Sequence, residues 1–292
     1  MTVARVIASL APDVDTAKVA LLGQGVWGST YDLGDGTVMK LIRRFAGLGD
    51  AVELWRNETR ALGAMADLAL PCPVPRLIAA GTPGSDSEAG RAGWLAWIRM
   101  SRLDGEAFDD DKVMALAPTA RSVLAHALGE TLAALHEADI AEAFADPRGD
   151  LDTGYLDEIA PVIGDVADPV LLDTLKASLA EMAAAPDTVA NHGDVNTTNI
   201  LADGDGRLTG LIDWAEARRD WAEAEFCHLR LAPEFFAPVR AAYEARRGLR
   251  LDDRRLDLAA LHNALITVAI ARRRGDKEEE AWGLEWVARL RG

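Results

Sequence analysis

Cysteine and long apolar runs are what this chain has least of. Only two cysteines, Cys72 and Cys227, occur in 292 residues. So few cysteines exclude a disulfide framework and predict a reducing compartment, the cytoplasm. No apolar run reaches the length of a membrane span, so we expect no membrane partner. Asp13 and Asp15 follow the short apolar start too early for a signal peptide.

An excess of basic residues is also missing. The net charge is −16, and residues 101–230 hold 27 Asp and Glu against 9 Lys and Arg, which leaves +2 for the rest. Phosphate backbones need a basic face, so nucleic acid is excluded as a partner. The acidic window would attract a cationic small substrate. A generally acidic, solubilising surface explains the same charge equally well.

Three polar residues near the middle of the chain, Asp194, Asn199 and Asp213, each have apolar neighbours. Two short strands, at 200–201 and 208–212, are predicted to form a hairpin through a Gly/Asp-rich turn. Such a hairpin would bring Asn199 and Asp213 together, with Asp194 on the loop that enters it. Two oxygen ligands beside a carboxylate suit Mg²⁺ with a base alongside. The alternative is that all three are turn and strand-end residues.

The order of these residues carries a resemblance. The motif begins with His-Gly-Asp, which is followed after four residues by Asn and two aliphatic residues, and it ends with Ile-Asp-Trp. This pattern resembles the core of the aminoglycoside phosphotransferase and choline kinase group. The resemblance implies an α+β, bilobal, protein-kinase-like fold, with a small β-rich nucleotide lobe and a larger, mainly helical lobe. It also implies ATP (or GTP) and Mg²⁺ as cofactors, and transfer of the γ-phosphoryl group to a hydroxyl of a small molecule.

The resemblance also implies roles for the motif. Asp194 would be catalytic and accept the hydroxyl proton, while Asn199 and Asp213 would hold Mg²⁺. His192 would brace the loop through hydrogen bonds. Residues 1–100 would form the nucleotide-binding lobe, and residues 101–292 the catalytic and substrate-binding lobe.

A glycine-rich stretch near the N-terminus contains Gly23, Gly25 and Gly28. A dinucleotide-binding fold would require a helix after these glycines. Here a buried strand at 19–22 precedes them, and strands at 29–33 and 37–42 follow. In a kinase-like lobe the glycine backbone closes over the phosphates. Lys40, on the third strand, then reaches the α and β phosphates, unless it is simply an exposed strand lysine.

A lysine in that role needs an acidic partner. Residues 50–65 have helical spacing, and Glu58 on this helix corresponds to the glutamate of related kinases, with Glu53 as the alternative. Strands are expected at 76–80 and 94–99, with a polar turn at 81–93 between them. The resemblance implies that the connector that follows, with Ser101 and Leu103, would lie beside the adenine.

Helices dominate the rest of the chain. One is expected over 113–140, where His136 is predicted to be a buried hydrogen-bonding residue, and two or three over 141–190. Closing helices are expected at 232–249, 252–273 and 276–290. Asp220 and Glu225 match acidic positions of the family, while Trp221 replaces its proline.

Two other functions remain as alternatives. A protein kinase would carry lysine where Asn196 stands and would need a long activation segment, for which there is no room before Glu225. A non-catalytic nucleotide-binding regulator belongs to another class. We favour a small-molecule hydroxyl substrate, such as an aminoglycoside or amino alcohol, and a monomer or homodimer.

Overall fold

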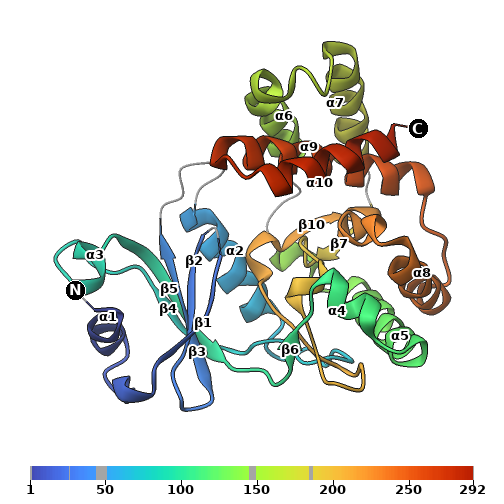
Figure 1. The fold of residues 1–292 in the computed structure, drawn as a ribbon. Coiled ribbons are helices and arrows are strands. Elements are labelled where there is room, and N and C mark those ends of the chain that lie inside the picture. Colours follow the sequence, from blue (N-terminus) through green and yellow to red (C-terminus); the bar gives the residue numbers. More distant parts are fainter. Residues whose placement is uncertain (1, 26, 44–50, 145–148, 184–186, 292) are drawn as a thin grey trace.

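The structure is a computed structural model that describes residues 2–25, 27–43, 51–144, 149–183 and 187–291. The described chain forms a smaller sheet-containing lobe and a larger helical lobe (Figure 1). The smaller lobe is an antiparallel sheet in the order β1-β2-β3-β5-β4, with three helices beside it. Its elements are β1 (Ala20–Gln24), β2 (Gly28–Asp32), β3 (Thr37–Arg43), β4 (Leu77–Gly81), β5 (Trp94–Ser101), α1 (Val3–Leu10), α2 (Ala51–Ala64) and α3 (Glu88–Arg91).

The alternation of side chains along β3 determines where Lys40 points. Met39 and Leu41 belong to the apolar cluster that packs against α1 and α3. Val38 and Ile42 belong to the larger cluster that contains the apolar residues of α2. Because successive side chains of a strand point to opposite faces, Lys40 shares the α2 face with Val38 and Ile42.

Parts of the sequence-based interpretation were wrong, in the smaller lobe and at the start of the larger one. Every residue of β1 is exposed, although a buried strand was expected, because β1 is an edge strand. The region at 81–93 contains α3, whose N-terminus Ser87 caps by accepting a hydrogen bond from Gly90 N. The expected helix at 113–140 is two helices, with Pro118 beginning the second. Asp50, expected to begin α2, lies outside the described residues.

The core of the larger lobe is built on α5 (Pro118–Glu137), which packs against α8 (Pro233–Arg247). The two helices approach closely at Gly129, where a Cβ would lie 2.4 Å from the carbonyl oxygen of Val239. Large side chains such as Trp214 and Phe235 belong to the same apolar cluster and are fully buried. The short helix α4 (Asp110–Ala115) precedes α5.

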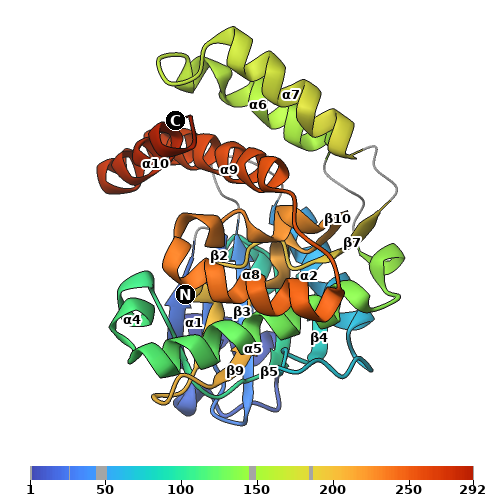
Figure 2. The same cartoon turned by 90° about the vertical axis from the view of Figure 1, so that its right-hand side faces the viewer.

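Four further helices form a separate layer with their own apolar cluster. The α6–α7 hairpin lies against α9, on the side away from α5 and α8 (Figures 1 and 2). No helix in the described part of the chain is long and apolar enough to cross a membrane. The layer consists of α6 (Gly149–Ile163), α7 (Pro169–Ala183), α9 (Asp253–Arg274) and α10 (Lys277–Leu290), so the expected closing helices are present.

Two small sheets lie between the lobes. The predicted hairpin is present as β8 (Ile200–Ala202) and β9 (Leu208–Leu211), and β6 (Glu106–Ala107) pairs with β8. The second sheet pairs β7 (Thr188–Asn191) with β10 (Arg218–Trp221). The segment 192–199 connects the two sheets, and Asp213 follows β9 closely. The observed architecture confirms the expected α+β, bilobal fold.

Candidate active site

The backbone of the loop that contains Asp194 is hydrogen-bonded to one buried carboxylate. Glu225 is fully buried, and its two oxygens accept hydrogen bonds from His192 N (2.8 Å) and Gly193 N (3.0 Å). Gly193 has φ of +84°, and a Cβ there would lie 2.3 Å from the carbonyl oxygen of Glu216. Only glycine fits this position without displacing backbone. The chain's own contacts therefore fix the conformation of the loop.

Glu225 is itself part of a buried chain of hydrogen bonds. His136 Nε2 lies 3.2 Å from Glu225 Oε2, and His136 Nδ1 lies 2.8 Å from the hydroxyl of Tyr243. Burial pushes the pKa of Glu225 upward, but the hydrogen bond and charge of His136, the charge of His192 and the N–H of Gly193 together lower it by more. The pKa of Glu225 is therefore lowered, and the ionised form supports the loop.

The Asp194 side chain is fixed by three donors. Oδ1 accepts from Asn196 Nδ2 at 2.9 Å and lies 3.0 Å from His228 Nε2, while Oδ2 accepts from Asn199 Nδ2 at 2.9 Å. Burial raises the pKa of Asp194, but the hydrogen bonds that His228 and Asn196 donate to the carboxylate act in the opposite direction. The net effect is a lowered pKa, so the carboxylate is ionised. The side chain remains 28% exposed, so an incoming group can reach it.

Asn199 and Asp213 come together at the end of the hairpin. The N–H of Ile212 donates to the carbonyl oxygen of Asn199 at 3.0 Å, which places Asn199 beside Asp213. The Asn199 amide nitrogen is used by Asp194, so its oxygen is the atom left for a cation. Asp213 has φ of +63°, a left-handed conformation that is uncommon in non-glycine residues, although aspartate adopts it more readily than most.

These donors fit Mg²⁺. An amide oxygen and a carboxylate that is 44% exposed are the hard oxygen ligands this ion prefers. No group of three or more His, Cys, Asp or Glu side chains that could hold a metal occurs among the described residues. Mg²⁺ does not need such a group, because in nucleotide sites one or two carboxylates act together with water and substrate phosphates.

Lys40 connects the sheet lobe to this hairpin. Its Nζ lies 2.8 Å from Glu58 Oε2 and 2.7 Å from Asp213 Oδ1. Glu58 is buried, whereas Glu53 is exposed. Burial would lower the pKa of Lys40, but the charges of Asp213 and Glu58 raise it, so the ammonium is retained. The pKa of Glu58 is raised, chiefly because the carboxyl is buried.

The glycines and the connector have different structural requirements. A Cβ on Gly28 would lie 2.1 Å from the carbonyl oxygen of Leu41, whereas one on Gly23 or Gly25 would meet no described atom within 4 Å.

Ser101, at the start of the connector, is the last residue of β5. Its hydroxyl oxygen already accepts a hydrogen bond from Arg76 N at 2.8 Å.

Leu103 lies two residues further along the connector. Its Cδ1 would be 2.6 Å from a Cβ placed on Gly210 of β9. The connector between the lobes therefore packs on the hairpin that carries Asn199 and Asp213.

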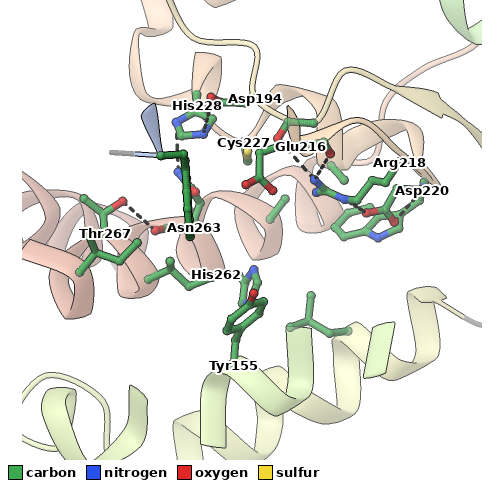
Figure 3. A pocket seen from close by; sticks show the side chains of 18 of the residues that line it. Tyr155, Asp194, Glu216, Arg218, Asp220, Cys227, His228, His262, Asn263 and Thr267 are labelled. Atoms are coloured by element: carbon green, nitrogen blue, oxygen red, sulfur yellow. Dashed lines mark hydrogen bonds and ion pairs between the residues drawn. The ribbon is translucent and has the colours of Figure 1, made fainter. Parts of the chain in front are cut away.

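A cavity of about 340 Å³ opens beside Asp194. Figure 3 shows Asp194 and His228 on one side of it and Tyr155 of α6 on the other, pointing toward His262 of α9. Trp27, from the glycine-rich loop, also lines it. The remaining lining residues come from the loop that contains Asp194, the region around β10 and the helical layer; they are Leu179, Gly193, Glu216, Arg218, Asp220, Trp221, Ala224, Cys227, Ala259, Asn263, Ile266, Thr267, Ile270, Arg274 and Glu279.

The cavity wall is less acidic than the charge distribution of the sequence suggested. The lining residues include four carboxylates and two arginines, so the formal charge of the wall is −2 when the histidines are neutral. Both arginines are paired with lining carboxylates: Arg218 with Asp220 at 2.7 Å and Arg274 with Glu279 at 3.3 Å. Much of the acidic charge of residues 101–230 therefore lies elsewhere on the surface.

Sequence reasoning missed several residues of this site. His228, which contacts Asp194, has no motif spacing to it and comes from a different element. Polar residues of α9 form part of the wall, and a signal for them existed in the sequence. His262, Asn263 and Thr267 lie at helical spacing on a face that otherwise carries Ala259, Ile266 and Ile270.

Comparison with solved structures finds the same fold at low sequence identity. The GDP and kanamycin complex of APH(2")-IIIa has a TM-score of 0.73 at 17% identity, covering 98% of this chain and 96% of the other. The GDP complex of aminoglycoside 2'-phosphotransferase-IIIa has a TM-score of 0.71 at 18%, covering 97% and 95%. The macrolide 2'-phosphotransferase MphH from Brachybacterium faecium, an apoenzyme, has a TM-score of 0.62 at 20%, covering 97% and 96%.

No curated protein matches the sequence significantly. The model of the phosphotransferase enzyme family, however, matches residues 18–282, which include the glycine-rich loop, Lys40, Asp194 and Asp213. By this match, the chain belongs to the phosphotransferase enzyme family.

Proposed function

We propose that this protein is a kinase that transfers the γ-phosphoryl group of ATP or GTP to a hydroxyl of a small molecule, with Mg²⁺ as cofactor. One observation carries the proposal. A carboxylate that is ionised and accessible, Asp194, faces a cavity and is hydrogen-bonded to Asn199, which adjoins Asp213 and, through it, the Lys40–Glu58 pair. Family membership supports the same reaction class.

The residues divide the chemistry between them. Asp194 orients the acceptor hydroxyl through Oδ2 and takes its proton, while the amides of Asn196 and Asn199 hold the carboxylate in place. Lys40, fixed by Glu58, neutralises phosphate charge. Asn199 and Asp213 would hold Mg²⁺, which supplies positive charge beside the phosphates. Gly23, Gly25 and Gly28 would cover the phosphates, and Ser101 and Leu103 would border the base.

The acceptor we propose is a cationic or amphipathic hydroxyl compound. The cavity combines a small excess of carboxylates with aromatic surface from Trp27, Tyr155 and Trp221 and aliphatic surface from Ile266 and Ile270. The similar structures include complexes with kanamycin, with gentamicin and with streptomycin, and a macrolide phosphotransferase. Aminoglycosides, macrolides and amino alcohols therefore form the panel to test.

The nucleotide is tested in the same way. Similar structures hold GDP in some cases and ADP or ATP in others, so both ATP and GTP belong in the assay as donors.

We place the enzyme in the cytoplasm because Cys72 and Cys227 are free. We place the division of the chain near residues 100 and 101, because β5, the last strand of the sheet in chain order, ends at Ser101.

The test is phosphoryl transfer by the purified protein. It is measured as the release of nucleoside diphosphate in the presence of Mg²⁺ and each acceptor in turn. We expect turnover with at least one hydroxyl compound. Asp194→Asn should lower kcat by about 10² to 10⁴-fold, because it removes the proton acceptor. Nucleotide affinity of this variant should stay within about twofold of wild type. Nucleotide binding without transfer to any acceptor would instead indicate a nucleotide-binding regulator.

A further inference from the structure

The wall of the cavity reaches the catalytic carboxylate through two side chains that the function described so far does not use. His228 lies between the short helical turns at Ala222–Phe226 and Leu229–Leu231, and its Nε2 is 3.0 Å from Asp194 Oδ1. On its other side, His228 Nδ1 is 3.2 Å from Asn263 Nδ2. Asn263 belongs to α9 and lines the cavity. Figure 3 shows the three side chains in this order.

The chemistry of the three groups determines where the ring proton lies. An ionised carboxylate can only accept hydrogen bonds, so the His228 nitrogen that faces Asp194 carries hydrogen. An amide nitrogen can only donate, so the nitrogen that faces Asn263 carries a lone pair. The imidazole is therefore the neutral Nε2–H tautomer, and Asn263 is the group that selects it.

The same geometry distinguishes the two oxygens of Asp194. Oδ1 accepts from both Asn196 and His228, which fills both of its lone-pair positions. Oδ2 accepts a hydrogen bond from the side chain of Asn199, which fills one position. The oxygen left with accepting capacity for a substrate hydroxyl is therefore Oδ2.

We propose that His228 and Asn263 are positioning residues, which form a relay from α9 to Asp194 and present Oδ2 to the acceptor hydroxyl. This proposal rests on the proposed phosphotransferase function. The relay makes the orientation of the carboxylate depend on a helix that also lines the acceptor cavity. An acceptor that displaces Asn263 would disturb Asp194 as well, so α9 would select for compounds that leave this pair intact.

The kinetic test uses variants of His228. His228→Leu removes the donor to Asp194 and should lower kcat by about 10 to 100-fold, with the nucleotide KM within about twofold. His228→Gln places an amide N–H near the position of Nε2 and should recover most of that loss. His126→Gln, at an exposed position of α5, is the matched control and should behave like wild type. An unchanged kcat in His228→Leu, or equal losses in the Leu and Gln variants, would overturn the relay.

A second measurement needs no acceptor. In ¹⁵N-histidine-labelled protein, long-range ¹H–¹⁵N spectra distinguish a protonated ring nitrogen from one with a lone pair, and His228→Gln identifies the His228 signals among the five histidines. We expect a protonated Nε2 and a lone pair on Nδ1, and Asn263→Ala should weaken this preference. A protonated Nδ1 in the wild type contradicts the relay. If no acceptor is ever phosphorylated but the Nε2–H pattern is found, the proposed phosphotransferase function is wrong, whereas the hydrogen-bonded arrangement of Asn263, His228 and Asp194 is confirmed.

Discussion

Lys40 Nζ lies 2.7 Å from Asp213 Oδ1, although the two residues are 173 positions apart in the sequence. The contact joins the third strand of the sheet lobe to the hairpin of the helical lobe. Glu58 Oε2 approaches the same ammonium at 2.8 Å, so one cation is shared between a buried and a half-exposed carboxylate. A group that carries charge from one lobe to the other is suited to hold the phosphates of a nucleotide between them.

The first prediction concerns the buried partner of Lys40. Glu58→Gln removes the charge that fixes the ammonium and should weaken Mg-nucleotide binding by about 10-fold or more, because a hydrogen bond between charged groups is lost. Glu53→Gln, on the exposed face of the same helix, should leave the affinity unchanged. Isothermal titration with ATP and GTP measures both variants. Equal affinity of Glu58→Gln and wild type would contradict the role assigned to Lys40.

The second prediction concerns the cation. Asp213→Asn and Asn199→Ala should each reduce the gain in nucleotide affinity that Mg²⁺ provides, because each removes one oxygen ligand. The measurement is the ratio of nucleotide Kd values with Mg²⁺ and with EDTA. Asp205→Asn, in the turn of the same hairpin and 80% exposed, is the matched control. If both site variants kept the wild-type ratio, Mg²⁺ would have to be held elsewhere.

The parts of the fold that the sequence could predict are those governed by local pattern. The β8–β9 hairpin and the closing helices follow from turn residues and from apolar periodicity, and both are present. The exposure of β1 was missed because an edge position is a tertiary property that an apolar run does not reveal. The break at Pro118 was missed although proline is a local signal, because the chain is helical on both sides of it.

For the site, the order and spacing of the motif are enough to predict that Asp194, Asn199 and Asp213 lie near one another. The partners from other elements could not be predicted in this way. His228 and Asn263 have no sequence spacing to Asp194. The turn after Phe226 places His228 beside Asp194, and the packing of α9 places Asn263 beside His228. The pairing of cavity arginines with carboxylates, which limits the acidity of the wall, also depends on side-chain geometry.

The third prediction separates two kinds of glycine in one loop. Gly28→Ala should destabilise the protein by about 1–3 kcal/mol, because its Cβ would lie 2.1 Å from a backbone carbonyl oxygen that cannot move away cheaply. Gly25→Ala should change stability by less than about 0.5 kcal/mol, because its Cβ would meet no described atom within 4 Å.

The same pair of variants tests the nucleotide-covering role of the loop. If the phosphates lie under the loop, the new methyl group of Gly25→Ala should weaken nucleotide binding by about 10-fold, equal to about 1.4 kcal/mol. Urea unfolding and isothermal titration measure the two effects. A variant at Gly25 that is both stable and fully competent in nucleotide binding would show that the loop does not cover the phosphates.

The fourth prediction is a pH dependence of stability that originates at Glu225. Its pKa is lowered from the ordinary 4.5 because His136, His192 and the N–H of Gly193 favour the carboxylate despite burial. A lowered native pKa contributes stability that is fully present above the unfolded value and is lost as pH falls through the native value. Glu225→Gln should therefore be less stable than wild type at pH 7, by about 2 kcal/mol in the free energy of unfolding.

Below about pH 4.5 the gap between wild type and Glu225→Gln should narrow, because the wild-type carboxylate becomes protonated and loses its charge-assisted hydrogen bonds, whereas the amide does not titrate. Urea unfolding at a series of pH values from about 3 to 7 measures the difference. Glu181→Gln, at an exposed position of α7, should show no pH-dependent gap. A gap of constant size across this range would mean that Glu225 supports the loop through shape and packing, with no contribution from its charge.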